Sequence, residues 1–127
     1  MRSEADARLA LAEKLNGAEA NLQLAKSRHY AAKARLDEVE KSRKDFRDIY
    51  TDARAKLDTK LTAGERLAVI KEINVCLEQI AERDRDLQRA KSEEGTAAKE
   101  VAKYGEECES FARELLKLLP DALLVSP

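Results

Sequence analysis

The stretch that decides the fold is Asp58-Thr59-Lys60-Leu61-Thr62-Ala63-Gly64-Glu65, which lies near the middle of the 127-residue chain. Thr62 and Glu65 have the Ser/Thr-x-x-Glu spacing of a capping box, in which each side chain accepts a hydrogen bond from the other residue's backbone N–H. Such a box marks the first turn of a helix. The chain is therefore predicted to turn over residues 59–63 and to begin a new helix there.

Apolar side chains recur on both sides of this turn at alternating steps of four and three residues, the spacing of a heptad repeat. The first series is Leu11, Leu15, Ala18, Leu22, Ala25, His29, Ala32, Leu36, Val39, Arg43, Phe46, Tyr50, Ala53 and Leu57. The second is Val69, Ile73, Cys76, Ile80, Arg83, Leu87, Ala90, Glu94, Ala97, Val101, Tyr104, Cys108, Phe111, Leu115 and Leu118. We call these two series together the seam.

The seam predicts an all-α fold, a long antiparallel two-helix coiled-coil hairpin forming a single domain over residues 1–127. Helix 1 is expected over about 4–58 and helix 2 over about 64–118. Pro120 cannot continue a helix, so residues 119–127 are expected to form a short apolar tail. This tail contains Leu119, Leu123 and Leu124, which either fold back onto the hairpin or bind a partner.

An antiparallel turn places Leu57 opposite Val69, and this pairing fixes the register of all later layers. Small residues then mostly face large ones, as close packing requires. The predicted layers are Ala53 with Ile73, Tyr50 with Cys76, Phe46 with Ile80, Val39 with Leu87, Leu36 with Ala90, Ala25 with Val101, Leu22 with Tyr104, Ala18 with Cys108, and Leu15 with Phe111.

One flank of the seam carries complementary charges in this register. The predicted ion pairs are Lys56 with Glu72, Arg35 with Glu93, Arg28 with Glu100, and Lys14 with Glu114; Ser42 also faces Asp86. Each exposed pair contributes at most about 1 kcal/mol, but together they disfavour other registers.

The opposite flank has no complementary pair, and near the turn it contains Leu67, Ile70 and Leu77. We interpret this edge as a protein-docking surface, completed by a third helix from a partner or a second copy. The alternative is a wide core stripe partly covered by the stems of Arg47 and Arg54.

Two arginines, Arg43 and Arg83, face each other within the seam. Repulsion and desolvation would make this costly, so Arg43 is expected to pair with Asp84 and Arg83 with Glu40. The cluster is interpreted either as a register pin or as a partner-binding notch.

Composition argues against most other classes. The chain is 43% apolar, 39% charged and only 4% aromatic, which leaves little volume for the core of a pocket enzyme. The formal net charge of −1 predicts no general attraction to nucleic acid. The polar N-terminus lacks the apolar stretch of a signal peptide or a membrane-spanning helix, so the protein is expected to be cytoplasmic and not inserted in a membrane. Two cysteines without CxxC spacing and one histidine predict no metal, no cofactor and reduced thiols.

The chain resembles the small helical-hairpin stalk proteins of flagellar and virulence type III secretion systems over about residues 8–118. The resemblance rests on the unbroken hairpin, the central turn, the basic-aromatic stretch over residues 43–50 and the Ala-rich second helix ending over residues 111–116. It implies a non-enzymatic stalk or adaptor in protein transport. Such a protein docks on the export ATPase and the export gate and can escort substrate chaperones.

A second interpretation stays open at this point. Many coiled coils share these features, and a generic assembly or adaptor protein, such as a phage, plasmid or scaffold accessory, would have the same pattern. Both interpretations predict protein partners, and homo-oligomers are compatible with both.

Overall fold

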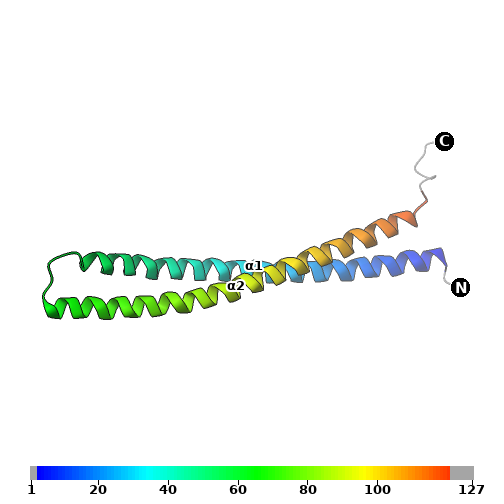
Figure 1. Ribbon diagram of the computed structural model, residues 1–127. Coiled ribbons are helices and arrows are strands. Elements are labelled where there is room, and N and C mark those ends of the chain that lie inside the picture. The colour runs from blue at the N-terminus through cyan, green and yellow to red at the C-terminus, as the bar shows by residue number, and fades with distance from the viewer. Residues whose placement is uncertain (1–2, 121–127) are drawn as a thin grey trace. The chain divides into compact units, whose positions relative to one another are not determined.

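A computed structural model gives the structure of residues 3–120, which form two α-helices joined by a short connection. Helix α1 spans Glu4–Lys56 and helix α2 spans Ala63–Lys117, with 53 and 55 residues (Figure 1). The described residues contain no β-strand. The predicted all-α hairpin is confirmed.

The predicted capping box begins α2. The Thr62 N–H donates to Glu65 Oε1 at 3.3 Å, and the Glu65 N–H donates to Thr62 Oγ1 at 3.1 Å. These two bonds satisfy backbone donors that have no partner within the helix. The position of the turn thus follows from two side chains that the sequence identifies directly.

Helix α1 ends two residues before the predicted boundary. The N–H groups of Leu57 and Asp58 donate to carbonyls three residues back, those of Arg54 and Ala55, at 3.1 and 3.2 Å. The Thr59 hydroxyl also donates to the Lys56 carbonyl at 2.6 Å. This tightened last turn satisfies carbonyls that have no partner further along the helix, and it replaces the α-helical bonds that the heptad pattern had suggested.

The other two helix ends are also capped locally. The Asp6 N–H donates to Ser3 Oγ at 3.1 Å, as at a typical N-cap. Helix α2 ends at Lys117, and the N–H groups of Leu118 and Leu119 bond three residues back. Pro120 follows and has no N–H to donate. The remaining tail, residues 121–127, lies outside the described residues.

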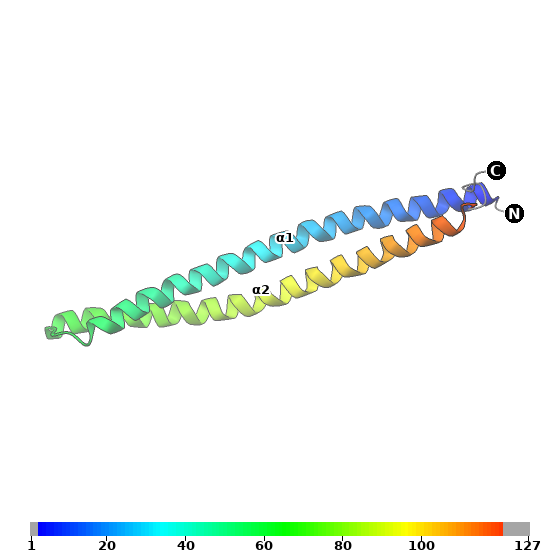
Figure 2. The ribbon, with the colours of Figure 1, turned by 90° about the horizontal axis from the view of Figure 1, so that it is seen from above.

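Contacts divide the chain into two compact units, each containing part of both helices. Residues 31–94 form the turn unit, and residues 1–30 together with 95–127 form the terminal unit. Within each unit the two helical segments run in opposite directions side by side (Figure 2). The interpretation of residues 1–127 as a single domain stays a prediction.

The predicted seam is the buried surface of both units. All buried apolar side chains of the described residues belong to it: Ala18, Ala25, Val39, Ala53, Val69, Ile73, Cys76, Ala90 and Ala97. The other seam residues are half-buried, except Leu118, which is 40% exposed. The heptad pattern therefore identifies the core.

In the turn unit, Ala53, Val69 and Ile73 form one packed cluster, against which Tyr50, Leu57 and Leu61 pack. The cluster contains both members of two expected layers, Ala53 with Ile73 and Leu57 with Val69. In the terminal unit, Arg28 Nη1 lies 3.9 Å from Glu100 Oε2, as the flank charges predict. The other three predicted flank pairs form no ion pair among the described residues. The individual seam layers further from the turn, such as Phe46 with Ile80, stay predictions.

Candidate protein-binding edge

The seam of the turn unit determines which side chains of α2 point to its edge. Val69 and Cys76 are buried, with 8% and 4% exposed, whereas the residues that follow them, Ile70 and Leu77, are 39% and 47% exposed. Consecutive residues on a helix point about 100° apart, so residues that directly follow the seam lie beside it on one edge. Leu67, three residues before Ile70, is 57% exposed on the same side.

Basic side chains from α1 belong to the same edge. Arg47 follows the half-buried Phe46, and Arg54 follows the buried Ala53, so both stand in α1 where Leu77 and Ile70 stand in α2. Both arginines are exposed, and neither forms an ion pair among the described residues. We call Leu67, Ile70, Leu77, Arg47 and Arg54 together the basic edge.

The two seam arginines turn to opposite flanks of the turn unit. Arg43 Nε donates to Asp84 Oδ1 on the flank of the basic edge, which confirms one predicted pair. On the other flank, Arg83 Nε donates to Ser42 Oγ at 2.9 Å and Arg83 Nη1 donates to Asp86 Oδ2 at 3.4 Å. The divergence separates the two guanidinium groups.

The prediction that Arg83 pairs with Glu40 is therefore wrong. The Arg83 guanidinium also lies 5.6 Å from the centre of the Phe46 ring, where the face of the ring attracts a cation. Ser42, Asp86 and Phe46 hold it on the flank away from Glu40. Ser42, Arg83 and Asp86 also line a hollow on this flank, so the register pin and the partner-binding notch both stay open as interpretations.

The sequence interpretation missed two exposed apolar side chains on the opposite flank. Ile49 is 43% exposed and Val75 is 56% exposed. Ile49 lies one position before the seam residue Tyr50, and Val75 lies one position before Cys76. The signal in the sequence is an apolar residue directly before a seam residue, on the flank where charged pairs are predicted.

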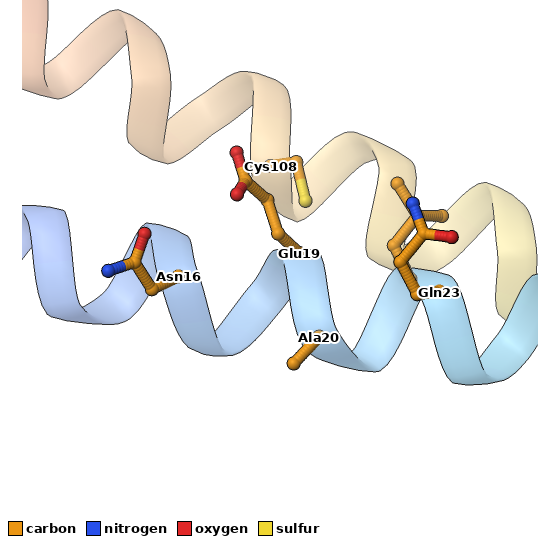
Figure 3. A pocket seen from close by; sticks show the side chains of 6 residues that line it. Asn16, Glu19, Ala20, Gln23 and Cys108 are labelled. Carbon is orange, nitrogen blue, oxygen red and sulfur yellow. The ribbon is translucent and has the colours of Figure 1, made fainter.

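The terminal unit has a shallow hollow between its helical segments. Figure 3 shows the side chains of Glu19 and Cys108 directed into the space between α1 and α2, whereas Ala20 is directed away from α2. Ala18 and Cys108 are predicted to share one layer of the seam. Because both side chains are small, they leave space between the two helical segments, and this space is the hollow. The hollow is lined by Asn16, Glu19, Ala20, Leu22, Gln23 and Cys108.

This hollow offers little for chemistry. Cys76 and Cys108 are both free thiols, the first buried and the second half-buried. No group of three or more His, Cys, Asp or Glu side chains could hold a metal ion within residues 3–120.

Only residues 119 and 120 of the predicted apolar tail belong to the described residues. Leu119 is 45% exposed, and it lines a second hollow with Glu4, Arg8 and Lys117. Leu123 and Leu124 lie outside the described residues. Their predicted role in partner binding stays a prediction.

No helix within the described part of the chain is both long and apolar enough to cross a membrane. No protein-family model matches the chain, and no curated protein or solved structure matches it significantly.

Proposed function

We propose that this protein is a non-enzymatic, cytoplasmic adaptor that binds other proteins through the basic edge of its helical hairpin. The observation that supports the proposal is the exposure of three large apolar side chains, Leu67, Ile70 and Leu77, beside the seam. A soluble surface rarely gathers such side chains without a binding role. Two arginines that have no ion-pair partner in the described residues stand on the same edge.

The energetics of docking favour a helix as the bound element. Ile70 and Leu77 are seven residues apart and repeat along the edge with the spacing of a coiled coil. Burying each such side chain contributes about 1.5 to 3 kcal/mol relative to leaving it exposed. Arginine is enriched in protein interfaces because its planar guanidinium pairs with carboxylates in two parallel hydrogen bonds.

The resemblance to type III secretion stalk proteins gives the more specific form of this proposal. In that form the hairpin docks on an export ATPase and an export gate, and it escorts substrate chaperones. The central turn and the half-buried Phe46 and Tyr50 within the basic stretch 43–50 support it. A generic coiled-coil assembly or adaptor protein is the second candidate, because its only requirement is a hairpin with an apolar edge.

The test is the double variant I70E/L77E, used as bait in a pull-down from the native host. We expect it to remain helical by circular dichroism, because both side chains lie outside the seam. We expect captured partners to be lost, because two carboxylates cannot be buried against an apolar surface. Mass spectrometry of the wild-type capture distinguishes the two forms of the proposal. An export ATPase supports the stalk, and phage structural proteins contradict it.

The matched control is L9E/L24E, which places the same charges at two exposed leucines of α1 in the terminal unit. It should capture the same partners as the wild type. If I70E/L77E is helical and still binds normally, the basic edge is not the docking surface. The tail that begins at Leu119 then becomes the preferred site.

A further inference from the structure

The turn unit carries exposed apolar side chains on two edges, and the charges around them have opposite sign. On the basic edge, Ile70 and Leu77 are accompanied by Arg47 and Arg54. On the other edge, the exposed Ile49 lies on the same helix as the exposed Asp45 and Asp52. We call Asp45, Ile49, Asp52 and Val75 together the acidic edge.

The charges on the two edges have the same spacing. Arg47 and Arg54 are seven residues apart in α1, which is two helical turns or roughly 10.5 Å. Asp45 and Asp52 are also seven residues apart, so both pairs have the same separation along a helix. Each charged pair can therefore meet the other one to one when the helices lie side by side.

Apolar side chains are placed to meet between these charges. Ile49 lies four residues after Asp45 and three before Asp52, which puts the three side chains on one face of α1. Val75 is 56% exposed on the corresponding flank of α2. When the acidic edge faces a basic edge, Ile49 and Val75 can cover Ile70 and Leu77.

These charges are not neutralised within the chain. Arg47, Arg54, Asp45 and Asp52 are all exposed, and none of them takes part in an ion pair among the described residues. Arg43, on the flank of the basic edge, already pairs with Asp84, and on the flank of the acidic edge Asp86 accepts a hydrogen bond from Arg83. These four side chains are therefore available to pair with another molecule, as are Lys56 and Glu72 on the flank of the acidic edge.

We propose that the acidic edge of one copy of this chain docks on the basic edge of a second copy. The inference rests on the proposed function, since it names the occupant of the same edge. Two different surfaces meet, so the contact is head-to-tail and each bound copy still offers one free edge of each kind. A symmetric dimer through one edge would instead place like charges against each other, which disfavours it.

The experiment uses purified full-length protein in sedimentation velocity, from micromolar to near-millimolar concentration. The wild type should form species larger than a monomer as its concentration rises, and added salt should weaken them because exposed charges are screened. R47E/R54E makes both edges acidic, and D45R/D52R makes both basic. We expect each variant alone to self-associate at least about tenfold more weakly than the wild type.

An equimolar mixture of these two variants is the decisive arm. Each acidic edge of one variant then meets a basic edge of the other, so the mixture should assemble although neither component does. The matched control is K26E/K33E, which reverses two exposed lysines seven residues apart in α1, outside both the basic edge and the acidic edge. It should associate like the wild type, and all variants should remain helical by circular dichroism.

Three results would overturn the proposal: a wild type that stays monomeric throughout, charge-reversed variants that associate like the wild type, or a mixture that stays monomeric. None of these would by itself contradict the proposed function. If the wild type is monomeric while I70E/L77E loses its partners from the host, the basic edge binds a different protein. If both experiments fail, the edge is not a docking surface.

Discussion

Replacing Ile73 with alanine is expected to lower the free energy of unfolding by about 2 to 3 kcal/mol. Ile73 is 9% exposed and belongs to the packed cluster with Ala53 and Val69. The loss falls toward the lower end of the usual range because a seam between only two helices lets water reach the space that the side chain leaves. Small domains are stable by only about 5 to 15 kcal/mol, so such a loss is large.

Urea denaturation followed by circular dichroism measures this effect, with V75A as the matched control. Valine and isoleucine are both β-branched, so replacing either with alanine gains a similar amount of helix propensity. Val75 is 56% exposed, however, and its replacement should change stability by no more than about 0.5 kcal/mol. A V75A cost equal to that of I73A would contradict the assignment of the seam in the turn unit.

The double variant R43L/R83L is expected to stabilise the chain by about 1 to 3 kcal/mol. Both arginines occupy seam positions and are half-buried, with 35% and 27% of the side chains exposed. Their ion pairs contribute little at this exposure, whereas two leucines would continue the apolar layers above and below. Thermal unfolding should show a higher midpoint, and a lower midpoint would show that the polar cluster is itself stabilising.

The same variant should also make the register less specific. With leucine at both positions, the seam around them becomes uniformly apolar, and a register shifted by one heptad loses its main penalty. Arg83 bonds to Ser42 only in the observed alignment. We therefore expect R43L/R83L to be more stable but to populate shifted alignments that the wild type excludes.

Periodicity made the helices, the seam and the turn predictable. Burial of the seam is a collective property of many residues, so no single misplaced side chain alters the outcome. The capping box was equally predictable because Thr62 and Glu65 lie within one helical turn and need no distant partner. The observed helix boundaries differ from the predicted ones by at most two residues. The difference of two residues lies at the end of α1, where the last turn is tightened.

Individual ion pairs were less predictable. Arg28 pairs with Glu100, but the other three flank pairs do not form in the described residues. Arg83 bonds to Ser42 and Asp86 instead of the predicted Glu40. Exposed pairs contribute at most about 1 kcal/mol and hold long, flexible side chains, so several arrangements have similar free energy. The spacing of charges predicts which flank is polar, but it does not predict which atoms meet.

The acidic edge was missed for a related reason. Val75 and Ile49 each lie directly before a seam residue, Cys76 and Tyr50, and they belong to no repeating series of their own in the sequence. They become a surface only when the hairpin brings the flanks of α1 and α2 together. A register is therefore needed before either edge can be recognised.

Both edges depend on the register in which α1 pairs with α2. Disulfide crosslinking to the native Cys76 tests it most directly, in a background in which Cys108 is replaced by alanine. Single cysteines are introduced by Y50C, by L57C and by R43C, which sample the expected partner of Cys76 and the two partners of heptad-shifted registers. Each is oxidised at low protein concentration, and intrachain bridges are identified by mass spectrometry.

We expect Y50C to form the intrachain bridge to Cys76, since a disulfide requires Cα atoms within about 7 Å. L57C and R43C should remain as free thiols, because each lies two helical turns from the layer that contains Cys76. Preferential bridging by L57C or R43C, or bridges formed only between separate chains, would contradict the register and both edges derived from it.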